Sequence, residues 1–97
     1  MSYLSVGSDA QRVQLQVEEL IVQIGDTSVV STSGSTATID CGQTVTSVVE
    51  ALFIDNSAGT IAPVVAADRV VSGSQVTLTL SAPFAANDSI RLCFKVN

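Results

Sequence analysis

The sequence predicts an all-β protein, built as a small antiparallel β-sandwich or barrel of about six to eight short strands. Val, Ile and Thr make up 30 of the 97 residues, and these β-branched side chains favour a pleated sheet over a helix. Short segments of alternating apolar and polar residues are separated by turns rich in Gly, Ser and Asp, which is typical of such folds. A chain of this length buries one core, so we expect residues 12–97 to form a single β domain.

The first alternating segment, residues 12–24, allows two interpretations. Apolar residues alternate as far as Val17 and resume at Leu20, one position out of phase. A strand with a β-bulge at Glu18 and Glu19 would produce this slip of one residue. The apolar positions of residues 10–24 also fit the spacing of an amphipathic helix. We favour the strand, because Val and Ile are frequent here and no helix cap is evident.

Residues 45–54 form the longest predicted strand, and both of its faces are apolar. One face carries Val45, Val49, Ala51 and Phe53. The other face carries Val48, Leu52 and Ile54 together with Glu50. A strand of this kind is either central in a sheet or covered by a neighbouring subunit.

The stretch FIDNSAGT at residues 53–60 follows this strand and combines an acid, an amide, hydroxyls and a glycine. It offers a single carboxylate, Asp55, and it lacks the spacing of a phosphate-binding loop. We therefore interpret it as a turn between two strands. In the next segment, Pro63 cannot donate a ladder hydrogen bond, which places it in an edge strand, at a strand start or at a bulge.

Three further strands are predicted from period-2 alternation. The first spans residues 36–41 and turns one side inward, with Ala37, Ile39 and Cys41. The second follows the turn signal SGSQ and turns inward Val76, Leu78 and Leu80. The last has the most regular pattern, with one apolar face made of Ile90, Leu92, Phe94 and Val96. Its other face carries Cys93, which we expect to lie away from the main core.

Charge and composition exclude several classes of partner. The net charge is −5, and four scattered basic residues are too few to hold a phosphate backbone, so we expect neither nucleic acid nor an anionic membrane as a partner. No segment has the length of an apolar membrane span, and the first residues lack the pattern of a signal peptide. We therefore expect the protein to be made in a cytosol and kept there, or assembled there into something larger.

The sequence contains no catalytic signature. It has no histidine to serve as a general base or to complete a structural zinc site with Cys41 and Cys93, which we expect to be free thiols. Five aspartates stand at predicted strand ends, where such side chains hold turns: Asp26, Asp40, Asp55, Asp68 and Asp88. We therefore expect no enzymatic activity, no cofactor and no metal.

The apolar content points instead to an interface between proteins. Hydrophobic residues make up 46% of the chain and the mean hydropathy is +0.47, which is high for a domain this small. Some apolar side chains must face outward, and contiguous exposed apolar surface usually marks a protein–protein interface. The second face of residues 45–54 is the candidate, with Val48, Leu52 and Ile54.

Residues 44–96 resemble a known class of proteins in style. A Val-rich strand leads into FIDNSAGT and is followed by VSGSQVTLTLSAP and ANDSIRL. These segments are similar to small β-rich structural proteins of tailed bacteriophages, including the capsid decoration, or cement, proteins. None of the segments is a diagnostic motif, and residues 1–43 add little to the likeness.

The resemblance implies a virion protein that is assembled in the host cytoplasm and binds the outer surface of the capsid. Its partners would be the major capsid protein and further copies of itself, with a trimer favoured over a dimer. Residues 1–11 would then be an N-terminal arm that becomes ordered on binding, with Tyr3, Leu4 and Val6 as anchors; the alternative is a frayed terminus. The alternative function is a β-sandwich adhesin or receptor-binding module of a virion.

Overall fold

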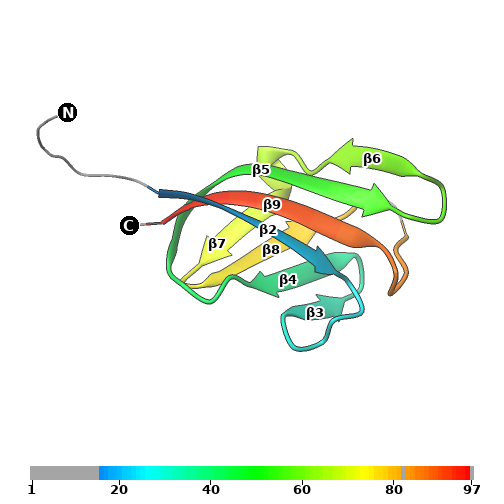
Figure 1. The fold of residues 1–97 in the computed structure, drawn as a ribbon, viewed down its shortest axis with the longest axis horizontal. Helices are drawn as coiled ribbons and strands as arrows, with labels where there is room; N and C mark the ends of the chain where they lie inside the picture. The colour runs from blue at the N-terminus through cyan, green and yellow to red at the C-terminus, as the bar shows by residue number, and fades with distance from the viewer. Residues whose placement is uncertain (1–15, 82, 97) are drawn as a thin grey trace, which may run out of the picture.

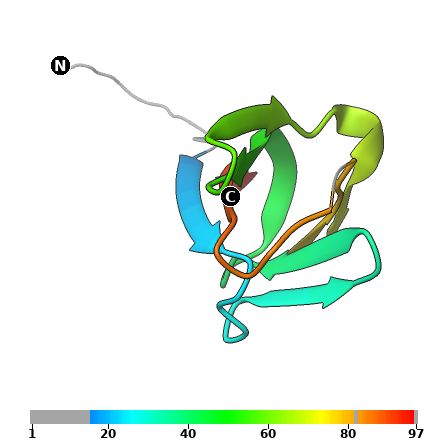
Figure 2. The ribbon, with the colours of Figure 1, turned by 90° about the vertical axis from the view of Figure 1, so that its right-hand side faces the viewer.

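The computed structural model describes residues 16–81 and 83–96, and this part of the chain forms a β-sandwich (Figure 1). Two antiparallel four-stranded sheets pack face to face and do not close into a barrel. The predicted all-β fold and the predicted number of strands are thereby confirmed. Figure 2 shows the chain crossing between the two sheets on both sides, from β2 to β3 and from β6 to β7.

The first sheet, called the β9 sheet here, has the order β2-β9-β5-β6. Its strands are β2 (Gln16–Gln23), β9 (Ser89–Val96), β5 (Val45–Asp55) and β6 (Thr60–Pro63). The second, the β8 sheet, has the order β3-β4-β8-β7. Its strands are β3 (Val30–Ser33), β4 (Thr36–Asp40), β8 (Gln75–Thr79) and β7 (Arg69–Ser72), and a 3-10 turn, η1 (Ala66–Asp68), precedes β7.

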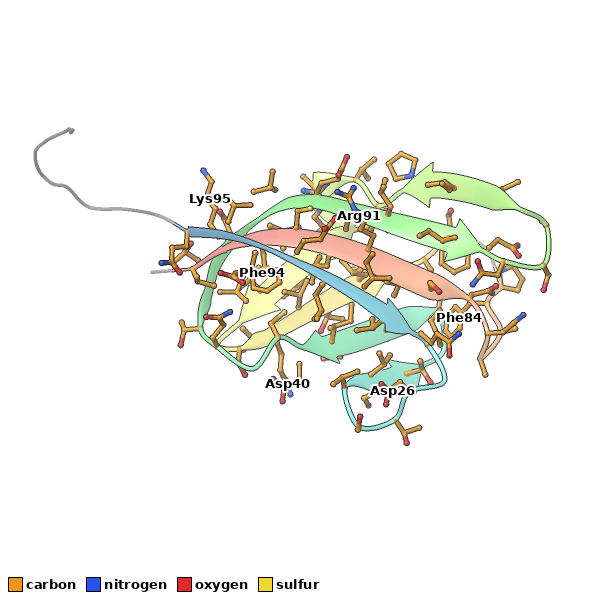
Figure 3. All side chains as sticks on the ribbon, viewed as in Figure 1. Asp26, Asp40, Phe84, Arg91, Phe94 and Lys95 are labelled. Carbon is orange, nitrogen blue, oxygen red and sulfur yellow. The ribbon has the colours of Figure 1, made fainter. Side chains whose placement is uncertain are left out.

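The core lies between the inner faces of the two sheets. Alternate residues of β9 are buried, as predicted, and Phe94 is among the largest fully buried side chains (Figure 3). The β8 sheet contributes Ala37, Ile39, Val76 and Leu78, all with no exposed surface. The inward alternation of residues 36–41 and 76–80 is thereby confirmed.

Strand β2 differs from its prediction because it contains no bulge. It pairs with β9 in one unbroken register, from Gln16 opposite Val96 to Gln23 opposite Ser89. Even-numbered residues of β2 therefore face inward, Glu18 included, and Val17 faces solvent. The helical alternative is wrong for residues 16–23, and residues 10–15 lie outside the described part of the chain.

The bulges occur in β5 instead. Its register against β9 shifts twice, between Val45 and Ser47 and between Val48 and Glu50, so that one extra residue is inserted each time. The second shift turns Val48 inward, opposite Phe94, where it packs against the core. It leaves Val49 49% exposed. The predicted placement of Val48 on the outer face and Val49 on the inner face is therefore wrong.

Strand β6 is an edge strand, as Pro63 predicted. The amide of Val64 donates to the carbonyl of Ala51 at 2.8 Å, and Pro63 is opposite Leu52. Since bonded and non-bonded pairs alternate in an antiparallel ladder, the nitrogen of Pro63 points away from β5. The missing N–H group of proline therefore removes no hydrogen bond from the sheet.

Arg69 joins the two sheets where the chain crosses from β6 to β7. Its Nε donates to the carbonyl of Val64 at 2.8 Å, and its Nη1 donates to the carbonyl of Val48 at 3.4 Å. The second carbonyl belongs to the bulged part of β5, beyond the end of β6. The guanidinium of Arg69 therefore donates its hydrogen bonds to backbone carbonyls of its own chain.

Candidate functional site

The outer face of the β9 sheet collects side chains from all four of its strands. Residues paired across the sheet form rows on one face. One row contains Ile21, Arg91, Leu52 and Pro63. The next row, toward the β5–β6 turn, contains Gln23, Ser89, Ile54 and Ile61. Two of the predicted interface residues, Leu52 and Ile54, thus lie side by side on this outer face.

The β5–β6 side of these rows forms an apolar corner of the face, defined by Leu52, Ile54, Ile61 and Pro63, and Ile21 lies across β9 from it, beyond Arg91. Ile21 is 63% exposed and Ile61 is 64% exposed, whereas Leu52 and Ile54 are half-buried between their neighbours. Side chains this apolar and this exposed are common singly, but a contiguous group marks an interaction surface. Of the other predicted interface residues, Val48 faces the core, and Tyr3, Leu4 and Val6 lie outside the described residues.

Charged side chains occupy the middle of the same face. Arg91 on β9 forms salt bridges with Glu19 on β2 and with Glu50 on β5, the latter at 3.0 Å. The hydrogen bond to Glu19 raises the pKa of the Arg91 guanidinium above its ordinary value. Lys95 lies two residues from Cys93 on β9 and is therefore diagonal to both glutamates in the ladder. This outer face therefore carries two acids and two bases, and the net charge of −5 belongs to the rest of the chain.

The outer face of the β8 sheet has a different chemistry. Its strands turn hydroxyl groups outward, from Ser31, Ser33, Thr36, Thr38, Thr77 and Thr79. Two of these, Thr38 and Thr77, hydrogen-bond each other across the strands at 2.9 Å. Val70 is an isolated exposed apolar residue on this face, 61% exposed and opposite Thr77. The contiguous apolar surface of the sandwich is thus on the β9 sheet.

The stretch FIDNSAGT makes the β5–β6 turn, as predicted, and not a ligand site. Asp55 Oδ1 accepts hydrogen bonds from the amides of Ser57 and Ala58, each at 3.0 Å. Gly59 closes the turn with φ of 70°, a left-handed conformation that suits glycine. The carboxylate of Asp55 is therefore used by its own turn.

Asn56 in this turn contacts a second loop, which holds the one buried acid of the described chain. Asp88 is 3% exposed, and its Oδ1 accepts from the amide of Asn56 at 3.1 Å while its Oδ2 accepts from the amide of Ala85 at 2.8 Å. The side chain of Asn56 donates to the carbonyl of Asn87 at 2.6 Å. These bonds fasten the loop before β9 to the end of β5, which is a structural role.

The described residues bring together no cluster of potential metal ligands, since no group of three among His, Cys, Asp and Glu is formed in them. An open hollow of about 470 Å³ has no titratable side chain in its lining, which consists of Gly34, Ser35, Leu80, Ser81, Pro83 and Phe84. No helix in residues 16–81 and 83–96 is both long and apolar enough to cross a membrane.

Both cysteines are free thiols, and they have different surroundings. Cys93 lies on the outer face of the β9 sheet, as predicted, in the row of Glu19 and Glu50. Cys41 packs against the core, where burial, and then the charge of Asp40, raises the pKa of its thiol to about 11. A thiol with this pKa is almost wholly protonated at neutral pH and is a poor nucleophile.

This pKa predicts the pH dependence of alkylation in a Cys93→Ser variant. Cys41 should react slowly with a maleimide at pH 8, and its rate should rise about tenfold per pH unit through pH 10 because only the thiolate reacts. The same variant in denaturant should instead level off near the ordinary thiol pKa of 9.0. Identical pH profiles for the folded and unfolded protein would contradict the assignment.

Comparison with known proteins gives no match: no protein-family model, no curated protein and no solved structure is detectably similar to this chain.

Proposed function

We propose that this protein is a non-enzymatic structural subunit that acts by binding other protein subunits. The observation that carries the proposal is the apolar corner, in which Ile61 is 64% exposed beside Ile54 and Leu52, together with Ile21, which is 63% exposed across β9 on the same sheet face. Exposing such a surface is unfavourable in water, and burying it against protein stabilises an assembly.

The side chains that could do chemistry support the same proposal. The chain has no histidine, and the raised pKa of Cys41 keeps its thiol protonated. The carboxylates of Asp26, Asp40, Asp55 and Asp88 each accept hydrogen bonds from nearby backbone amides. These groups hold loops in place, so catalysis would need residues other than these.

In its specific form the proposal is a capsid decoration protein of a tailed bacteriophage, as the likeness of residues 44–96 implies. The protein would bind the major capsid protein on the outer surface of the virion, and residues 1–11 would supply an attachment arm. Each copy would contribute modest contacts to neighbouring capsid subunits. Linked copies would then hold the lattice by avidity, with no turnover.

The alternative, an adhesin or receptor-binding module of a virion, receives less support from the side chains. Sugar-binding faces commonly use exposed aromatic rings. Phe53 and Phe94 are buried here, and Phe84 packs against the core. The described surface therefore lacks an aromatic platform.

Co-sedimentation with assembled capsids tests the proposed function. We expect the full chain to sediment with capsids built from the major capsid protein of the same phage, in a fixed stoichiometry and with a gain in capsid thermal stability. A variant lacking residues 1–11 should lose most of this binding while its melting temperature stays unchanged. A full-length protein that stays in the supernatant at every concentration would contradict the proposal.

A further inference from the structure

We propose that a hollow beside the crossing from β6 to β7 binds a lysine side chain of a partner subunit. The hollow has a volume of about 200 Å³, and its lining comes from β5, β6, η1, β8 and the residues that follow β6 and β8. It is next to the apolar corner, with which it shares Pro63. This inference rests on the proposed function, because it names the side chain by which a partner protein would be held.

Most of the lining is apolar. Phe53, Val64 and Leu80 line the hollow and belong to the core, since each is at most 6% exposed. Pro63 and Val65 are exposed and line it on the side of β6. Pockets that hold small-molecule ligands usually have volumes of about 300–1,000 Å³. The smaller volume of this hollow suits a single side chain better than a whole ligand.

The oxygen atoms of the lining come from the opposite side, formed by η1 and the end of β8. They belong to the carboxylate of Asp68 and the hydroxyl groups of Thr79 and Ser81. A lysine side chain has the same two parts, an apolar four-carbon stem and an ammonium group with three donors. Lying across the hollow, it would place its stem against Pro63 and Val65 and its ammonium group beside Asp68.

The carboxylate of Asp68 has no partner within the described part of the chain. The other four aspartates at strand ends accept hydrogen bonds from backbone amides. Asp68 was expected to hold its turn in the same way, but no hydrogen bond or salt bridge among residues 16–81 and 83–96 involves its carboxylate. The neighbouring Arg69 donates instead to the carbonyls of Val64 and Val48. An acid in the hollow is therefore left for a cation from outside.

This carboxylate selects among the side chains that a partner could supply. An apolar side chain would cover Asp68 without giving it a partner, and burying an unpaired charge is unfavourable. An acidic side chain would be repelled by Asp68 and by the net charge of −5. An arginine would neutralise the charge, but its planar fork favours one bidentate acceptor. Three separate oxygen-bearing side chains suit the three donors of an ammonium group better.

Two-dimensional NMR of the full chain, titrated with Nα-acetyl-lysine methylamide, tests the inference. We expect saturable shifts at the amides of Val65, Asp68 and Ser81, with a dissociation constant in the millimolar range. Asp68→Asn should raise this constant about fivefold, because it removes the ion pair from a site that water still reaches. The matched control is Glu19→Gln, which removes the same charge from the outer face of the β9 sheet and should leave the constant unchanged. The spectra also show whether both variants are folded.

Two further probes test the choice of side chain. Nα-acetyl-norleucine methylamide has an apolar stem without the ammonium group, and Nα-acetyl-arginine methylamide has a guanidinium in its place. Both should bind more weakly than the lysine probe, and the norleucine probe should bind Asp68→Asn as well as the unchanged chain. If either probe binds as tightly as the lysine probe, or if Asp68→Asn and Glu19→Gln weaken lysine binding equally, the inference is overturned.

Co-sedimentation separates this inference from the proposed function. Asp68→Asn should raise the concentration that half-saturates assembled capsids about fivefold. If Asp68→Asn sediments as tightly as the unchanged chain, the inference is overturned and the proposed function stands. A chain that binds the lysine probe but never sediments with capsids would contradict the proposed function and leave the lysine selectivity of the hollow standing.

Discussion

Replacing Asp88 with alanine is expected to lower the free energy of unfolding by about 3 kcal/mol, or the melting temperature by about 15 °C. The side chain is 3% exposed, and its two oxygens accept from the amides of Asn56 and Ala85. Alanine would leave both amides without these acceptors in a site with little access to water. Buried donors without partners are among the few causes of large single-residue losses. Thermal and chemical denaturation, followed by circular dichroism, measure the change.

Asp55→Ala is the matched control for this prediction. Asp55 also accepts from two backbone amides, those of Ser57 and Ala58, but it is half-buried and its turn lies close to water. Because water can replace its hydrogen bonds, the expected loss is about 1 kcal/mol. Equal losses for the two variants would show that burial of Asp88 is not what makes its hydrogen bonds important.

The two aspartates show why sequence alone predicts the turns but not their relative importance. Each stands at a strand end beside Asn or Ser, and both were predicted to hold turns. The hydrogen-bond partners of Asp55 are two and three residues away, so the local sequence is enough to predict these bonds. Asn56 is 32 residues from Asp88, and only the antiparallel pairing of β5 with β9 brings the two loops together.

The strands show the same division between local and distant causes. The alternation in β9 predicted its buried face, because the aliphatic and aromatic side chains of that strand all lie on one face. The phase change in β2 was interpreted as a bulge, although apolar Val17 and Ile21 simply face outward in an unbroken strand. The bulges of β5 leave no phase change that sequence could show, since Val48 and Val49 are both valines and either could face the core.

The residues of the candidate interface could also be predicted only in part, because some of them come together through the pairing of distant strands. The two apolar faces of residues 45–54 indicated Leu52 and Ile54, which lie on the outer face. Ile61, beside Ile54, and Ile21, across β9 from Leu52, were missed, because their positions on this face follow from strand order. The salt bridges of Arg91 join residues 72 and 41 positions apart, so no local spacing in the sequence predicts them.

Replacing Gly25 with alanine is expected to lower the free energy of unfolding by about 2 kcal/mol. A Cβ atom at this position would lie 2.8 Å from the Cβ of Ala86 and 2.9 Å from its carbonyl oxygen. The same carbonyl accepts the amide of Gly25 at 2.9 Å, and the next loop bond joins the amide of Ile24 to the carbonyl of Asp88 at 2.8 Å. The loop before β9 would have to move away from β2, which weakens these two bonds. Denaturant unfolding measures the loss.

Two further variants separate this crowding from backbone strain. Ala86→Gly in the Gly25→Ala background removes the contact at 2.8 Å but leaves the carbonyl at 2.9 Å, so it should restore about half of the lost stability. Gly59→Ala meets no atom within 4 Å and is disfavoured by its φ of 70° alone, at a cost of about 1 kcal/mol. No Ala86 variant should relieve that cost, because Ala86 plays no part in it. If Ala86→Gly fails to restore any stability to Gly25→Ala, the close approach of the two loops is not the reason why position 25 requires glycine.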